Sequence, residues 1–375
     1  MLKAGNTRSI IYCKMNRTVF SLLFGWLLMV SHLGLQAQTA VSEQVMQKIY
    51  QEVRTPFKYG LVLVPEDDKK MVDSPSIFRQ GKNWYMTYIV FDGKGYETWL
   101  ACSRDLLTWK TLGRILSASA NSWDSNQKAG YIALQNYDWG GNYSVGKYAG
   151  KYWMSYLGGA IQGYEAGILG IGIASTNRLI AVREWHVLDH PVISAKDADA
   201  RWYDHQTIFK STVIWDKKRT LGHPFVMFYN AKGGKKEDGL AEAERIAMAV
   251  SDDMVNWKRF GDRPVIDHKN GISGDAFIAR ISDVWVLFYF GAFWKPKAFD
   301  RFACSYDLVN WTDWTGEDLI SPSESYDSQY AHKPFVIKHK GVVYHFYCAV
   351  DSKERRGIAV ATSVNVGKSK LGFPD

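Results

Sequence analysis

The stretch "SYDLVNW" (residues 305–311) has two further versions in the chain, "SDDMVNW" (251–257) and "SRDLLTW" (103–109). All three fit the pattern Ser-x-Asp-[LM]-[LV]-x-Trp, and each follows a short strand-like segment, "RFAC", "AMAV" or "WLAC". Aspartate at this place is typical of a tight turn, and the tryptophan is suited to filling a core. A strand and turn that recur along the chain indicate an architecture of repeated units.

A second repeated pattern is strand–turn–strand, as in "SIFRQGKNWYMTY", "AFIARISDVWVLFYF" and "PFVIKHKGVVYHFY". Two more hairpins with longer loops bring the number of units to five between residue 73 and about residue 366. Each unit contains four strands, A to D. We therefore predict an all-β fold, a five-bladed β-propeller over residues 73–375. One long sandwich is the alternative, but a sandwich does not repeat a tryptophan-bearing turn at this spacing.

The N-terminus has the pattern of an export signal. Lys14 and Arg17 precede the apolar stretch "TVFSLLFGWLLMV", and the small-residue segment "LGLQAQ" follows it. We predict a signal peptide over residues 1–37, a periplasmic or extracellular location, and no stable membrane insertion after cleavage. Residues 38–72 form a lead-in with one short N-terminal helix, because "SEQVMQKIYQEV" (42–53) has apolar residues at helical spacing.

Composition narrows the possible partners. The 375 residues carry a formal net charge of +8, which falls to +4 without the four basic residues of the signal segment. No basic block is present, so we predict no nucleic-acid partner. Three cysteines remain after cleavage, which we interpret as buried thiols of a protein that is a monomer.

Titratable side chains recur where the innermost strand of a blade begins. Asp73, Asp204 and His332 each lie four residues before an apolar strand residue, and Asp275 lies three before one. Gln127 has the corresponding place in the second blade. These strand starts share one face of a propeller with the B–C loops, and loops on a rigid scaffold often carry binding sites.

Three carboxylates that converge on one apolar funnel suit acid–base chemistry. Like charges near an apolar wall raise one pKa and leave another group ionised. Glycoside hydrolysis needs this combination, with one protonated acid and one ionised base or nucleophile. Turn chemistry is the alternative interpretation of each aspartate taken alone.

At these residues the chain resembles the five-bladed propeller glycosidases, above all glycoside hydrolase family 43. It also has some likeness to the families of neoagarobiose hydrolases and mannoside phosphorylases. The resemblance extends from residue 73 to about residue 366 and rests on "DSPSIF", "YDHQTIF", "SGDAFI" and "AHKPFV". It implies hydrolysis with inversion of the anomeric configuration.

The resemblance also implies residue roles. Asp73 would be the general base, Asp204 would orient the acid, and Asp275 would be the general acid. Family members have a glutamate one place earlier and a proline at the last site, and this chain has neither. His332 would lie under the substrate, where an axial Ca²⁺ or Na⁺ ion is an option although no cofactor is required.

Loop residues supply further candidates. Glu97 and Glu165 both occur in "GYE" and are alternative acids. Trp294, Trp202 and Trp139 are candidates for stacking on a sugar, with Trp294 preferred. The predicted substrate-binding residues are His332, Trp294, Gln127, Trp202, Glu97 and His205. We expect no transition-metal site, because the nine histidines are scattered.

The sequence as a whole predicts an exported, inverting exo-glycosidase with an oligosaccharide substrate. Arabinofuranosides, xylosides or galactosides from plant or algal polysaccharides are the expected class. A propeller that binds carbohydrate without cleaving it is one alternative. A glycoside phosphorylase is another, with Lys295, Arg355 and Arg356 as its phosphate ligands.

Overall fold

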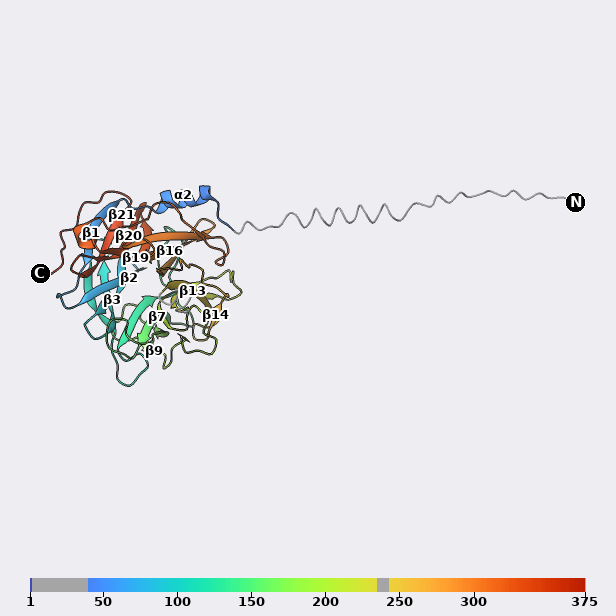
Figure 1. The fold of residues 1–375 in the computed structure, drawn as a ribbon, viewed down its shortest axis with the longest axis horizontal. Helices are drawn as coiled ribbons and strands as arrows, with labels where there is room; N and C mark the ends of the chain where they lie inside the picture. Colours follow the sequence, from blue (N-terminus) through green and yellow to red (C-terminus); the bar gives the residue numbers. More distant parts are fainter. Residues whose placement is uncertain (2–39, 235–242, 375) are drawn as a thin grey trace. The chain divides into compact units, whose positions relative to one another are not determined.

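The computed structural model describes residue 1, residues 40–234 and residues 243–374, so the predicted signal peptide lies outside the described residues. Within the described chain the all-β prediction is confirmed, since strands dominate and one α-helix precedes them (Figure 1). No helix in these ranges is long and apolar enough to span a bilayer. Helix α2 (Glu43–Val53) matches the predicted helix. Ser42 caps its N-terminus, and Met46, Ile49 and Val53 face the core.

The strands form five antiparallel groups in chain order. The first contains β2 (Met71–Gln80), β3 (Asn83–Phe91), β4 (Tyr96–Ser103) and β5 (Lys110–Leu116). The second contains β6 (Gln127–Ile132), β7 (Tyr152–Gly159), β8 (Gly170–Thr176), β9 (His186–Val187) and β10 (Ile193–Ser194). The third contains β11 (Thr207–Trp215), β12 (Phe225–Lys232), β13 (Glu244–Ser251) and β14 (Trp257–Phe260).

The fourth group contains β15 (Ile272–Ile281), β16 (Val284–Ala292), β17 (Ala298–Ser305) and β18 (Thr312–Asp313). The fifth contains β19 (Tyr330–His339), β20 (Val342–Val350), β21 (Arg356–Thr362) and, from the other end of the chain, β1 (Phe57–Leu63). A short 3₁₀ helix, η2 (Ser325–Asp327), precedes β19. Strand β1 pairs antiparallel with β21, with Leu61 opposite Ala359. The sequence analysis placed these N-terminal residues in a lead-in and did not predict this pairing.

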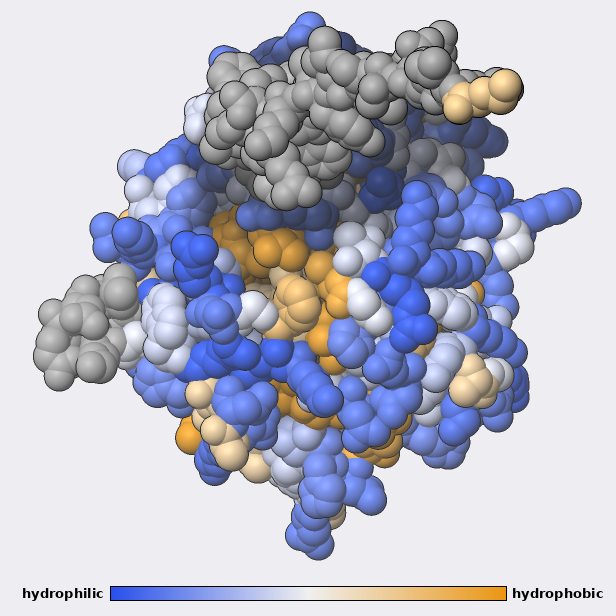
Figure 2. Space-filling view, turned by 90° about the vertical axis from the view of Figure 1, so that its right-hand side faces the viewer, coloured by the Kyte–Doolittle hydropathy of each residue, from blue (hydrophilic) through white to orange (hydrophobic). Residues whose placement is uncertain are grey.

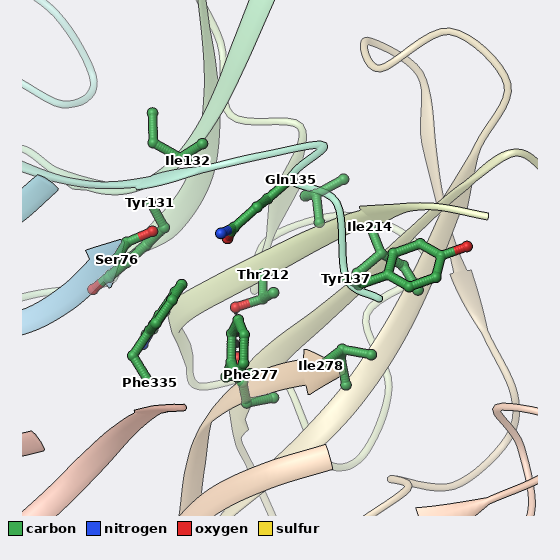
Figure 3. Close-up of a pocket in the computed structure, with 13 residues that line it drawn as sticks. Ser76, Tyr131, Ile132, Gln135, Tyr137, Thr212, Ile214, Phe277, Ile278 and Phe335 are labelled. Carbon is green, nitrogen blue, oxygen red and sulfur yellow. Dashed lines mark hydrogen bonds between the residues drawn. The ribbon is translucent and has the colours of Figure 1, made fainter. Parts of the chain in front are cut away.

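The first strands of the five groups surround a common axis. Strands β2, β6, β11, β15 and β19 contact one another in this order, and β19 contacts β2 again. All five line one small internal cavity of about 20 Å³, through Ser76, Tyr131, Thr212, Phe277 and Phe335 (Figure 3). This volume is about that of one water molecule, so the axis is packed here.

The three repeated turns have one hydrogen-bonding pattern. In the last of them the Asp307 carboxylate accepts from the backbone N–H groups of Val309 and Asn310, at 2.9 and 2.8 Å. Leu308 is buried with φ of +67°, and Trp311 Nε1 donates to its carbonyl. The Trp311 ring then packs edge-on against Phe228 of the preceding group. The aspartate thus stabilises a left-handed leucine that any turn of this shape requires.

We predict that Asp307→Ala lowers the free energy of unfolding by about 1–2 kcal/mol, because two backbone donors lose a charged acceptor. Urea denaturation at pH 7 measures the change. Asp283→Ala is the matched control, since Asp283 is an exposed aspartate in a hairpin turn. Equal losses in both variants would contradict a specific role for the turn.

Candidate active site

Bulges in the inner strands turn polar side chains toward the axis. The register shifts between Asp73 and Ser76 in β2, between Gly274 and Phe277 in β15, and between His332 and Phe335 in β19. A bulge bends its strand and re-aims a side chain, and bulges are frequent beside active sites. The three shifts are equivalent, so Asp73 corresponds to His332, whereas Asp275 corresponds to the next residue, as Ser74 and Lys333 do.

These bulge residues share an uncommon backbone conformation. Ser74, Asp275 and Lys333 have φ of +47°, +57° and +66°. Left-handed residues other than glycine are strained and concentrate at functional sites. The register difference of Asp275 in the sequence is therefore a real difference of position, since its side chain projects from the bulge itself.

Asp204 does not share this position. The bulge of β11 lies between Ile208 and Ser211, so Ile208 is the equivalent of Asp73, and the predicted equivalence is wrong by four residues. The buried Asp204 carboxylate lies before the strand and accepts from Arg259 Nε at 2.6 Å and Tyr229 Oη at 2.8 Å. In β11 it is Lys210 of the bulge that reaches the axis.

A cavity of about 310 Å³ lies at this end of the axis. Figure 2 shows one face of the molecule, on which apolar side chains lie in a central hollow surrounded by hydrophilic ones. Apolar and aromatic side chains also line much of the cavity. Its charged or polar lining residues include Asp73, Tyr164, Glu165, Lys210, Asn230, Glu244, Asp275, His332, Lys333, Glu354 and Arg356. Such a concave site with converging polar groups is the usual form of a small-ligand pocket.

Asp73 is the centre of a buried charge cluster. Its Oδ2 accepts from Lys333 Nζ at 2.6 Å and from Arg356 Nη1 at 3.3 Å, and its Oδ1 accepts from Ser74 N. Burial by itself raises the pKa of Asp73, but the two cations hold this pKa well below its usual range. The carboxylate is therefore ionised throughout the physiological pH range.

Asp275 lies beside this cluster and has its own partners. Its Oδ1 accepts from Asn230 Nδ2 at 2.9 Å, and its Oδ2 lies 3.4 Å from Lys210 Nζ. The Ser74 hydroxyl joins Asp275 to the Asp73 side of the cavity, at 3.4 Å. Two carboxylates and two ammonium groups are thus held within one network.

His332 also lines the cavity. Its Nδ1 bonds the Cys348 carbonyl at 3.2 Å, so Nδ1 carries the proton and Nε2 is an acceptor. Burial lowers the pKa of His332 to about 3, and the adjacent Lys333 contributes to this shift, so the ring is neutral. No group of three metal-ligating side chains occurs in the described ranges. The predicted axial cation fits these surroundings poorly, because the positive charges of Lys333, Lys210 and Arg356 already occupy them.

Two glutamates line the same cavity. Glu165 precedes β8 in a loop, has φ of +48°, and accepts from Tyr96 Oη at 3.2 Å. Burial raises the pKa of Glu165, and Asp73 adds to this while Lys333 opposes it. Burial, with the nearby charge of Glu165, raises the pKa of Glu244 to about 8. Two carboxyl groups that perturb each other in one cleft are candidates for proton transfer.

Sequence reasoning considered Glu165 as an alternative acid and missed Glu244. Glu244 ends a long, charged B–C loop and begins β13, and nothing in "AEAE" distinguishes it from its neighbours. Its position follows from a parallel bridge to Ile272 of β15, a contact between two groups.

Several predicted substrate-binding residues lie outside the cavity lining. Trp294 Nε1 donates to the Ile272 carbonyl, and its ring stacks on His268. The Gln127 amide group bonds backbone groups of neighbouring loops. Glu97 pairs with Arg114 at 2.6 Å.

The remaining candidates also have other partners. Trp202 is half exposed, with the Arg245 guanidinium over its ring, and His205 bonds the Trp202 carbonyl. Trp139 donates to Glu52 of α2. The phosphate-ligand candidates Lys295 and Arg355 form ion pairs with Asp318 and Asp351, so Arg356 is the one of the three that lines the cavity.

A closed strand ring with paired carboxyl groups in an axial pocket is the form of an acid–base carbohydrate enzyme. Two solved structures, one identified as a BT0996 complex with RGII and the other as a glycoside hydrolase, are each 51% identical to this chain. Each has a TM-score of 0.86, with 89% of this chain and 99% of the other covered. This protein belongs to the glycoside hydrolases.

A thermostable family-43 glycoside hydrolase shares the fold, with a TM-score of 0.56 and 13% identity over 82% of this chain and 96% of that one. The resemblance derived from the sequence is therefore confirmed. No family model and no curated protein matches the chain.

We predict that Lys333→Met lowers the free energy of unfolding by about 3 kcal/mol, because it leaves the buried Asp73 carboxylate with one cation fewer. The double variant with Asp73→Asn should recover part of this loss. Urea denaturation of the single and double variants forms the thermodynamic cycle.

Lys295→Met is the matched control, since the Lys295–Asp318 pair is more exposed and should contribute less than about 1 kcal/mol. Additive losses in the Asp73 and Lys333 variants would contradict the coupling.

Proposed function

We propose that this glycoside hydrolase releases a terminal sugar from a polysaccharide fragment, with Glu244 as general acid and Glu165 as the partner carboxylate. The observation that carries the proposal is the pair of glutamates in one cavity, both with raised pKa values. Their environments differ, and acid and base roles are assigned by such differences.

Glu244 suits the acid because it is protonated at neutral pH. Its pKa of about 8 results first from burial and then from the charge of Glu165. A protonated carboxyl in a partly desolvated site can donate to the oxygen of the scissile bond as the leaving group departs.

Glu165 suits the base because cations oppose the effect of its burial. Lys333 and Arg356 both lower the pKa of Glu165, while burial and Asp73 raise it. The neighbouring Tyr164 hydroxyl accepts from Arg356 Nη1 at 2.6 Å, which ties the loop to the charge cluster. We propose that Glu165 activates a water, in keeping with the inversion that the family resemblance implies.

The assignment from the resemblance, with Asp73 as base, Asp204 as modulator and Asp275 as acid, is the second candidate. The contacts favour the glutamates, since Lys333, Arg356 and Ser74 engage both oxygens of Asp73 and hold its pKa low. A base of low pKa accepts a proton poorly. We propose that Asp73 and Asp275 orient Lys333 and Lys210 and bind sugar hydroxyls, together with neutral His332.

The closed inner end of the pocket supports exo action. We propose that the five strand groups are the blades of a propeller and that the axis narrows from about 310 Å³ at the pocket to about 20 Å³ beyond Tyr131 and Lys210. A sugar ring can enter the first space and cannot pass into the second. A dead-end pocket accepts the end of a polysaccharide rather than an internal segment.

For the substrate we propose an oligosaccharide from RGII, the polysaccharide named for the 51% identical relative. Terminal arabinofuranosyl, xylosyl and galactosyl units are the candidates. We also propose an exported monomer that needs no metal. Release of a sugar from RGII oligosaccharides, followed by NMR of the first-formed anomer, tests the substrate and the inversion together.

The phosphorylase alternative is less favoured, because Lys295 and Arg355 are engaged by carboxylates outside the cavity. Turnover that requires inorganic phosphate would support it. Turnover in phosphate-free buffer with release of free sugar supports hydrolysis.

We predict that Glu165→Gln lowers kcat about 10³-fold on the aryl glycoside that the wild type cleaves fastest, because it removes the base. Glu97→Gln is the matched control from the same "GYE" pattern and should keep most of the activity. Steady-state kinetics measure both. Equal effects in the two variants would contradict the assignment.

We predict a bell-shaped pH dependence of kcat/KM. Activity should fall as the pH rises through about 8, because Glu244 then loses the proton that it must donate. It should also fall on the acid side, above the ordinary glutamate range, as Glu165 becomes protonated.

With a 2,4-dinitrophenyl leaving group, Glu244→Gln should stay active and lose the alkaline decline, since this leaving group needs no acid. An alkaline decline that persists in the variant would assign that pKa to another group.

A further inference from the structure

Phe293 is an aromatic side chain without a structural reason for its position. It follows β16, lies on the rim of the cavity and is 67% exposed. Its φ of +68° is left-handed, which a residue with a bulky side chain rarely adopts. Exposure of a large apolar ring and backbone strain both oppose folding, and such features persist at functional sites.

The next residue holds this loop in place. Trp294 points inward, donates its Nε1 hydrogen to the Ile272 carbonyl at 2.9 Å, and stacks on His268 with ring centroids 4.0 Å apart. The Phe299 ring packs edge-on against Trp294 at 4.8 Å. The left-handed turn at Phe293 thus presents its ring outward from an anchored loop. Little conformational entropy remains to be lost when a ligand packs against the ring.

Strand pairing puts Phe293 on the same side of the cavity as Glu244. Glu244 of β13 is opposite Ile272 of β15, and Ile272 is opposite Ala292 of β16. The backbone just before Phe293 is therefore two strand spacings, about 10 Å, from the backbone of Glu244. Both side chains line the cavity.

We propose that Phe293 is the platform on which the sugar of the leaving group packs. The inference rests on the proposed role of Glu244, because a general acid protonates the oxygen of the leaving group and so marks the side on which that group lies. The apolar C–H face of a sugar ring packs on an aromatic face, and the exposed Phe293 ring offers one. Phe293 then determines the preference for a saccharide over a small leaving group.

Two substrates with the same glycosyl unit test the proposal. One is the RGII oligosaccharide, and the other is the glycosyl fluoride of the sugar that the wild-type enzyme releases from it. Because fluoride has no ring to pack, the ratio of kcat/KM values for oligosaccharide and fluoride isolates the platform. We expect Phe293→Ala to lower this ratio at least about tenfold, mainly through KM, and Phe293→Tyr to retain it.

Phe57→Ala is the control, since Phe57 is an exposed phenylalanine of β1 in the fifth group. A ratio that stays at the wild-type value in Phe293→Ala, with an active wild type, would overturn the platform and leave the proposed function intact. A wild type without activity on either substrate would overturn the proposed function, and the inference with it. A loss of the ratio in Phe293→Tyr as large as in Phe293→Ala would also contradict packing on an aromatic face.

Discussion

The ion pair between Asp73 and Lys333 is the contact on which the rest of the molecule depends. It joins β2 of the first group to β19 of the last, with side chains 5% and 12% exposed. Charges buried to this extent persist when they are paired and hydrogen-bonded. The pair connects the two ends of the strand ring where the chain does not run continuously. The same cations then set the electrostatics of the cavity, so ring closure and site chemistry share one interaction.

The site combines stabilised and strained groups. Asp73 is ionised at all physiological pH values because its cations outweigh the effect of burial. Glu244 is kept protonated because burial and a like charge outweigh the cations near it. The second arrangement opposes folding at high pH, since a buried carboxyl with a raised pKa must be deprotonated there. Stability is thus spread over the bulges and turns, while the reacting groups are held in unfavourable states.

Particular residues show how far sequence reasoning reached. Asp73, Asp275 and His332 were predicted to meet at the axis, and they do, because the repeat places each at the start of an inner strand. Asp204 was assigned by the same spacing and lies elsewhere, since the bulge of β11 begins four residues later than expected. Trp294 was preferred as a stacking residue. The structure buries it against His268 and exposes its neighbour Phe293, a difference that depends on one left-handed φ angle.

The sequence by itself determined the repeat and the local turns. A Ser-x-Asp turn depends on hydrogen bonds among residues within three or four positions of one another, so its pattern is legible in the chain. The tertiary structure alone decided the partners of the carboxyl groups. Glu244 acquires its raised pKa from burial and from Glu165, and Asp73 acquires its lowered pKa from residues 260 and 283 positions away. Electrostatic interactions depend on distance in space and on burial, and neither is encoded in local spacing.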